Sequence, residues 1–185
     1  MNYLLNVDNI ILHFCSVVIK NNFFDTVMPI ASNINNNGEV WILIAIVLLL
    51  NKNIEVKEIG AAMLIALLLG LVLGEGVLKN LIGRARPTSP AYNYTFLISP
   101  PKSFSFPSGH TTSSFAAFGV CFFKKARYRY FALALAITIA FSRIYLHVHY
   151  PSDILGGIIL GLISAKLAVN ISKKFFRKKV LKGEG

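Results

Sequence analysis

Acid–base and nucleophilic side chains are concentrated in one short stretch, SRIYLHVHYPSD, which covers residues 142–153. His149 lies four residues before Asp153, and a carboxylate near an imidazole fixes the tautomer of the ring and stabilises its cationic form. Arg143 lies inside an apolar segment, where a charged side chain is costly and by default indicates function. Pro151 prevents a continuous helix, so the stretch forms a tight connection between two apolar segments. His147 is two residues from His149, points to a different helical face, and is expected to be structural.

A second motif, SFPSGHTT, covers residues 105–112 and opens another apolar segment. Pro107 and Ser108 are favourable at a helix start, and Gly109 lets a ligand approach the backbone closely. A helix N-terminus presents free N–H groups and a positive dipole end, which suit a phosphate. Taken alone, the motif fits a capped turn with a structural His110 equally well.

A third motif, KNLIGRARP, covers residues 79–87 at the end of a further apolar segment. Lys79 and Arg86 would emerge there and could bind an anion, although snorkelling to lipid headgroups is the alternative for both. Glu75 lies one helical turn before Lys79, where it is expected to pair with that lysine or to contact a headgroup. Arg84 is a further possible headgroup contact.

The elements that must position these groups are strongly apolar. Hydrophobic residues make up 55% of the 185 residues and charged residues 15%, whereas a soluble domain carries about 25% charged residues. Five segments, roughly 38–51, 59–82, 108–125, 129–149 and 153–171, are candidates to cross a bilayer, and the first is the shortest. We therefore predict an all-α fold, a polytopic membrane helical bundle with about five transmembrane helices.

The N-terminal residues, 1–37, have a mixed character. Asn9, His13, Ser16 and Lys20 recur at helical spacing among apolar residues, which predicts amphipathic helices lying at the membrane interface. A further transmembrane helix is the alternative. The first residues lack a basic region and a small-residue cleavage site, so we expect no removable signal peptide. Residues 38–171 would then form the catalytic transmembrane core, and 172–185 a basic tail.

The charge pattern indicates a membrane surface rather than nucleic acid. The net charge is +11, but the basic residues lie between the apolar segments and in the tail. Basic loops at 52–57 and 124–129 and the tail at 173–182 fall on one side if the five segments span, and that side is expected to be cytoplasmic. The loop 83–107 and the turn near 149–152 would face the periplasm or the exterior. An interfacial aromatic belt is expected in that loop, from Tyr92, Tyr94, Phe104 and Phe106.

The same topology brings the three motifs to one membrane face. Two imidazoles, three cations, a helix N-terminus and one orienting carboxylate would be gathered there. Such a set fits phosphoryl transfer, in which catalysis consists mostly of positioning and charge stabilisation.

These motifs match the pattern K-x6-R-P, P-S-G-H and S-R-x5-H-x3-D at every position and spacing. The sequence therefore resembles the type-2 phosphatidic-acid phosphatase (PAP2) superfamily over about residues 38–171. The matching residues are Lys79, Arg86, Pro87, Pro107, Ser108, Gly109, His110, Ser142, Arg143, His149 and Asp153.

The resemblance implies a role for each matched site residue. His149 would be the nucleophile that forms a phosphohistidine, Asp153 would orient it, and His110 would protonate the leaving oxygen and then activate water. The phosphate oxygens would be held by Lys79, Arg86 and Arg143, with help from Ser108 and the backbone of Gly109. No metal and no cofactor are implied, and the eight acidic residues form no carboxylate cluster suited to Mg²⁺.

The implied substrate is a lipid phosphate or pyrophosphate in a bacterial cytoplasmic (inner) membrane. The short N-terminal region resembles bacterial undecaprenyl-pyrophosphate phosphatases and lipid A 1-phosphatases, so those two substrates are favoured. Phosphatidylglycerophosphate and phosphatidic acid are the alternatives. Vanadium-dependent haloperoxidases share the motif set but are soluble, which the apolar segments argue against. An anion transporter or channel would leave the pairing of His149 with Asp153 unexplained.

Overall fold

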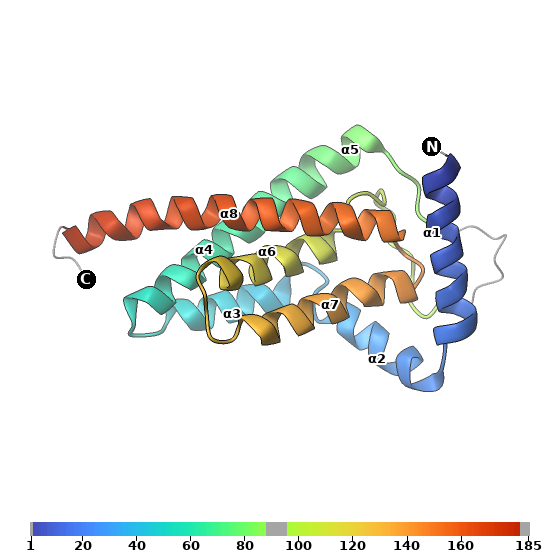
Figure 1. Cartoon of the computed structure of the whole chain (residues 1–185), viewed down its shortest axis with the longest axis horizontal. Coiled ribbons are helices and arrows are strands. Elements are labelled where there is room, and N and C mark those ends of the chain that lie inside the picture. Colours follow the sequence, from blue (N-terminus) through green and yellow to red (C-terminus); the bar gives the residue numbers. More distant parts are fainter. Residues whose placement is uncertain (1, 88–95, 182–185) are drawn as a thin grey trace.

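Every regular element in the described residues, 2–87 and 96–181, is a helix (Figure 1). In this computed structural model the π-helical turns η1 and η2 continue α1 and α4, and α5 follows η2 directly. The all-α prediction is therefore confirmed. In chain order the elements are α1 (Asn2–Phe14), η1 (Cys15–Ile19), α2 (Asn22–Asn33), α3 (Glu39–Leu49), α4 (Ile54–Leu71), η2 (Val72–Leu78), α5 (Lys79–Ile82), α6 (Gly109–Phe123), α7 (Arg129–Tyr145) and α8 (Pro151–Leu181).

Each of the five predicted apolar segments contains a helix. Two continuous helices, Ile54–Ile82 and Pro151–Phe176, are long and apolar enough to cross a bilayer by length and composition. By contrast, α3 has 11 residues, α6 has 15 and α7 has 17. The number of five transmembrane helices therefore stays a prediction. The helix α8 also continues beyond residue 171, where the basic tail was expected to begin.

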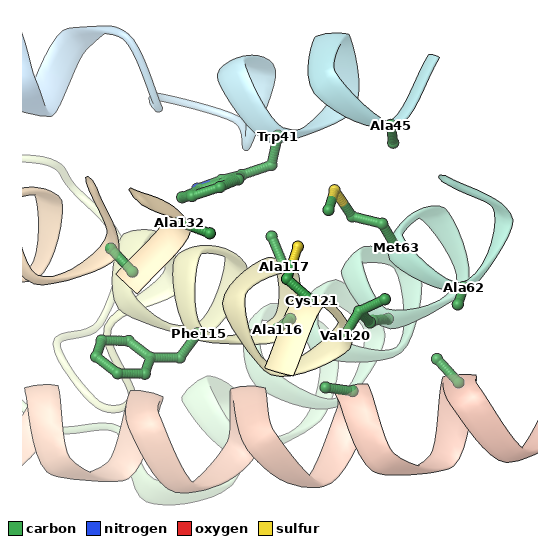
Figure 2. Packing of buried hydrophobic residues seen from close by; sticks show 14 of the residues in the cluster. Trp41, Ala45, Ala62, Met63, Phe115, Ala116, Ala117, Val120, Cys121 and Ala132 are labelled. Carbon is green, nitrogen blue, oxygen red and sulfur yellow. The ribbon is translucent and has the colours of Figure 1, made fainter. Parts of the chain in front are cut away.

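The core is centred on α6, which contacts α4, α7 and α8. Small and medium apolar side chains from these helices and from α3 fill it, with Trp41 and Met63 facing α6 (Figure 2). The close approach of α8 to α6 requires Gly161, because a Cβ there would lie 2.6 Å from the Thr112 carbonyl oxygen. Small residues at helix contacts are typical of packing between membrane helices.

The N-terminal helices close one end of the bundle (Figure 1). Contacts join α1 to α8, and α2 to α7. Apolar side chains on α1, including Tyr3, Ile10 and Phe14, are exposed, whereas Asp8 and Leu12 are buried. An outward apolar face fits the predicted contact with lipid, and the choice between an interfacial and a spanning helix stays a prediction.

The three motifs lie where helices begin or end. The helix α5 ends at Gly83, which has a φ of +60° in the left-handed region that glycine tolerates. The helix α6 begins after Ser108, whose hydroxyl caps it by accepting from the Thr111 N–H. The helix α8 begins at Pro151, whose missing N–H costs nothing in a first turn. The expected belt residues Tyr92 and Tyr94, and the tail residue Lys182, lie outside the described residues.

Candidate active site

Backbone hydrogen bonds hold the three motifs together at one end of the bundle. The Ser108 N–H donates to the Asp153 carbonyl at 3.2 Å, which joins the start of α6 to the start of α8. The Ser105 N–H donates to the Arg84 carbonyl at 2.7 Å, which joins the loop before α6 to the residues after α5. The motifs that the sequence analysis placed on one face are thus in contact.

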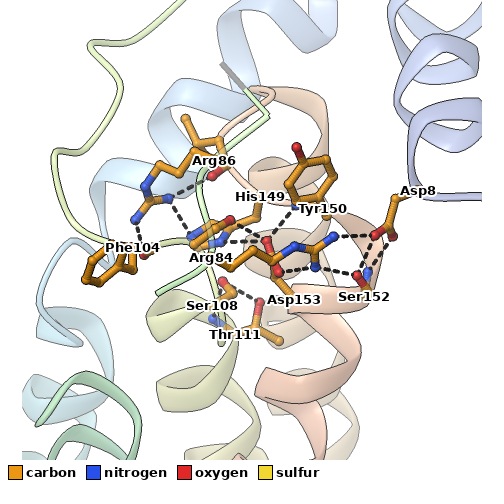
Figure 3. A network of polar contacts seen from close by, with 12 residues as sticks. Asp8, Arg84, Arg86, Phe104, Ser108, Thr111, His149, Tyr150, Ser152 and Asp153 are labelled. Carbon is orange, nitrogen blue, oxygen red and sulfur yellow. Dashed lines mark hydrogen bonds and ion pairs between the residues drawn. The ribbon is translucent and has the colours of Figure 1, made fainter. Parts of the chain in front are cut away.

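His149 lies between a carboxylate and a guanidinium, and all three groups are drawn in Figure 3. Its Nδ1 faces Asp153 Oδ2 at 3.5 Å, and its Nε2 lies 3.0 Å from Arg86 Nη1. Because an arginine only donates hydrogen bonds, the nitrogen that it contacts carries the lone pair. We therefore assign the proton to Nδ1, toward Asp153, and Nε2 becomes a potential nucleophile when Arg86 turns from it to a bound anion.

Asp153 is completely buried, and several donors share its two oxygens. Oδ2, which faces His149, accepts from the Ser105 hydroxyl at 2.5 Å and from the Tyr150 N–H at 2.8 Å. The other oxygen, Oδ1, accepts from Arg84 Nη1 at 2.6 Å. These contacts fix the carboxylate in place, and they also compete with the imidazole for its negative charge.

Arg86 is held by backbone carbonyls on two sides. Its Nε donates to the Ser103 carbonyl at 2.8 Å, Nη1 to the Val148 carbonyl at 2.7 Å, and Nη2 to the Phe104 carbonyl at 3.1 Å. Burial lowers the pKa of Arg86 below its ordinary value, while the charges of Asp153 and Glu75 oppose the shift. A guanidinium so placed remains charged at neutral pH and is a rigid anion partner.

Lys79 and Glu75 form an ion pair, with Nζ 2.8 Å from the carboxylate oxygens. The sequence analysis expected Glu75 to pair with this lysine or to contact a headgroup, and the structure shows the pairing. Lys79 Nζ also donates to the Ser103 hydroxyl at 3.3 Å, and the same hydroxyl oxygen accepts from Arg86 Nη2 at 3.0 Å. The lysine is thereby held beside Arg86.

His110 and Arg143 are positioned by the last turn of α2 and the segment that follows it. Arg143 Nη1 donates to the Ser32 hydroxyl. The Asn35 amide donates to the His110 carbonyl at 3.2 Å. The ring nitrogen Nε2 of His110 is buried and has no hydrogen-bond partner among the described residues, and neither has Arg143 Nε. Both side chains therefore keep polar atoms available for a ligand.

A cavity of about 920 Å³ joins these groups. One end of it is cationic and is lined by Lys79, Arg86, Arg143, His110 and His149. Another part of its wall is apolar and comes from α3 and α4. The apolar lining residues are Ile42, Leu64, Leu67, Leu68 and Leu71, and Leu68 is 60% exposed on the outside of the bundle. The cavity thus offers a charged end for an anion and an apolar wall for a hydrocarbon chain.

The remaining residues singled out from the sequence have other positions. Gly109 lines the cavity at the first turn of α6, whose N–H groups have no partner within the helix. Ser108 and Arg84 are not among its described lining residues. The hydroxyl of Ser108 accepts from Thr111, and Arg84, a possible headgroup contact, donates to Asp153. The ring nitrogen Nε2 of His147 lies 3.3 Å from the carbonyl oxygen of Leu12, which is a structural contact with α1.

Of the two described aromatic residues expected in the interfacial belt, only Phe104 is exposed. Phe106 packs against Gly156 of α8, where an added Cβ would lie 2.4 Å from its ring. Its position is therefore explained by packing inside the bundle.

Several residues that position the site were not singled out from the sequence. Ser32 and Asn35 precede the predicted core, Ser103 and Ser105 lie in the loop before α6, and Asp8 lies on α1. Of these, only Asp8 could have been found from the sequence, because a lone carboxylate in an apolar helix needs a polar partner. In the residues described, no group of three or more His, Cys, Asp or Glu side chains could hold a metal ion. Metal independence itself stays a prediction.

Comparison with known proteins agrees with the motifs. The profile of the PAP2 superfamily matches residues 58–177. An undecaprenyl-diphosphatase from Sulfolobus acidocaldarius is 30% identical over 143 residues, which cover 76% of this chain and 68% of that protein. A lipid A 1-phosphatase from Rhizobium etli is 38% identical over 92 residues, which cover 46% of this chain and 38% of that protein.

The fold is similar to that of a solved membrane enzyme. The crystal structure of a transmembrane PAP2-type phosphatidylglycerolphosphate phosphatase from Bacillus subtilis superposes with a TM-score of 0.73. The two chains are 26% identical, and the superposition covers 94% of this chain and 88% of the other.

Proposed function

The chain belongs to the PAP2 superfamily and is a phosphatase of that type, and we propose that it removes phosphate from membrane lipids through a phosphohistidine on His149. The observation that carries this proposal is the orientation of the His149 ring. Its lone-pair nitrogen lies at the cationic end of the cavity, beside Arg86, and its other nitrogen faces Asp153. A nucleophilic imidazole needs such an orientation, and Arg86 would release the Nε2 lone pair by turning to the phosphate when substrate binds.

In the first step, Nε2 of His149 attacks phosphorus and the bond from phosphorus to the lipid oxygen breaks. His110 gives its proton to that oxygen, so the lipid leaves as a neutral alcohol or as a lipid phosphate. The ring of His149 becomes cationic, and Asp153 balances that charge. Lys79, Arg86 and Arg143 hold the phosphate oxygens and stabilise the charge that develops on them.

In the second step, the intermediate is hydrolysed. His110, now neutral, accepts a proton from water as the water oxygen attacks phosphorus. The bond between phosphorus and Nε2 breaks, which releases inorganic phosphate and returns His149 to its neutral form. The unpartnered Nε2 of His110 supports its use as this acid and base.

The walls of the cavity support a lipid substrate. Leu68 and Leu71 lie both on the cavity wall and on the exposed surface of α4, so a chain from the surrounding bilayer would reach the charged end without crossing the polar loops. We favour undecaprenyl pyrophosphate or the 1-phosphate of lipid A, with phosphatidylglycerophosphate and phosphatidic acid as alternatives. The active site would face the periplasm or the exterior, and the C-terminus the cytoplasm.

Phosphate release by the purified protein across a lipid panel tests the proposal. The panel contains undecaprenyl pyrophosphate, lipid A, phosphatidylglycerophosphate and phosphatidic acid, and the His149→Ala variant is the control. We expect release from at least one lipid by the wild type and none by the variant. A second function, anion passage, is favoured by the buried cation Arg143. Phosphate flux into liposomes without any lipid hydrolysis would support that function and overturn ours.

A further inference from the structure

A buried carboxylate on the N-terminal helix is tied to the start of α8. Asp8 is 2% exposed, although the opposite side of α1 is apolar and exposed. Its Oδ1 accepts from the Ser152 N–H at 2.9 Å, and its Oδ2 accepts from the Ser152 hydroxyl at 2.5 Å. Ser152 directly precedes Asp153, so α1 contacts the residue next to the carboxylate that faces His149.

Arg84 links the two carboxylates. Its Nη2 donates to Asp8 Oδ2 at 2.7 Å, and its Nη1 donates to Asp153 Oδ1 at 2.6 Å (Figure 3). The Tyr150 ring covers the guanidinium, with its centroid 4.0 Å from Cζ. The cation is therefore fixed between the carboxylates and cannot turn away from either.

We propose that Asp8 is a positioning residue that acts on His149 through Arg84 and Asp153. The inference rests on the proposed role of His149. When that ring is phosphorylated it becomes cationic, and the negative charge of Asp153 stabilises it. A guanidinium at 2.6 Å cancels much of that charge. Asp8 supplies a second carboxylate to the same guanidinium, so Asp153 keeps its net effect on the imidazole.

The Asp8→Asn variant isolates this effect, because asparagine keeps the shape and can still bond to Ser152. Its neutral amide no longer compensates Arg84, so that the cation acts on Asp153 alone. The variant therefore loses stabilisation of the transition state, in which the ring charge develops, whereas substrate binding hardly changes. We expect kcat to fall by about tenfold, by analogy with the roughly 10–100-fold loss when the outer partner of a metal-binding histidine is removed. We expect KM to stay within about twofold.

Asp25→Asn is the matched control. Asp25 is also an N-terminal carboxylate bound to the core, since it accepts from the Tyr145 hydroxyl at 2.6 Å. In the part of the chain that the structure describes, it has no hydrogen bond or ion pair with Arg84 or Asp153, so Asp25→Asn should leave kcat unchanged. An Asp8→Asn variant with wild-type kcat, a change in KM alone, or an equal loss in Asp25→Asn would each overturn the inference.

A double-variant cycle tests the path through Arg84. If Asp8 acts through that cation, adding Asp8→Asn to Arg84→Gln lowers kcat no further than Arg84→Gln alone. Additive losses would refute the path. If Arg84→Gln does not fold, the comparison of Asp8→Asn with Asp25→Asn decides. A wild-type protein inactive on every lipid of the panel overturns the proposed function as well, whereas an active wild type with an unaffected Asp8→Asn variant overturns this inference only.

Discussion

Gly109 lies where α6 begins, and a side chain at this position would collide with the ion pair of Lys79. A Cβ on residue 109 would lie 2.4 Å from Glu75 Oε1, whereas ordinary contacts begin at 3.4 Å. In the Gly109→Ala variant the carboxylate must therefore move by about 1 Å, which is the difference between those distances. Both carboxylate oxygens lie 2.8 Å from Lys79 Nζ, and we expect a shift of this size to distort that ion pair.

The cost in stability should be small. Glu75 is 38% exposed in this pair, and such helical pairs contribute about 0.3–0.5 kcal/mol. A protein of this size loses about 2–4 °C in Tm per kcal/mol, so the change should stay below about 2 °C. The effect on activity should be larger, because a misplacement of about 1 Å in a positioned group can cost about a hundredfold in rate. We expect kcat/KM to fall between about tenfold and a hundredfold.

The assay is phosphate release by Gly109→Ala, with thermal unfolding measured on the same preparation. Gly76→Ala is the matched control, because it adjoins Glu75 and its added Cβ would meet no atom within 4 Å. Wild-type kinetics in Gly109→Ala, or an equal loss in Gly76→Ala, would refute the steric reasoning.

Three further outcomes follow from the arrangement of charges and helices. Activity should survive EDTA, since Lys79, Arg86 and Arg143 neutralise the phosphate, and restoration by Mg²⁺ after a loss would contradict this. A cysteine at exposed Ser99 should react with an impermeant reagent from outside, and one at exposed Arg127 should not; the reverse pattern would place the site on the cytoplasmic side. Gly161→Ala should reduce stability by about 1–3 kcal/mol in thermal unfolding, because its Cβ would meet backbone atoms of α6, and an unchanged Tm would argue against close α6–α8 packing.

The helices and the gathering of the motifs could be predicted from the sequence because both depend on local signals. Apolar runs locate the helices, and Pro151 and the Pro107–Ser108 pair indicate where two of them begin. The order of the segments then places His110, Arg86 and His149 at one end. The lengths of the helices were harder to predict, since α3 is shorter than its apolar run suggested and α8 continues past residue 171.

The supporting contacts could not be predicted because they join residues far apart in the chain. Ser32 reaches Arg143 across 111 positions, and Asp8 reaches Ser152 across 144. Serine and asparagine are common in loops for local reasons, so their types carry no sign of such a partner. Arg84 also has two plausible fates, a lipid headgroup or a buried carboxylate, and only the fold distinguishes them.

Trapping of radiolabelled phosphate on the protein tests the central claim, a phosphohistidine on His149, most directly. The account predicts no turnover and no bound label in His149→Ala, because the nucleophile is gone. With a pyrophosphate or aryl phosphate substrate, whose leaving group needs little protonation, His110→Ala should still be phosphorylated slowly. Because His110 also activates water, acid-labile and base-stable label should accumulate in that variant. Label trapped in His149→Ala, with none in His110→Ala, would contradict the account and reverse the two roles.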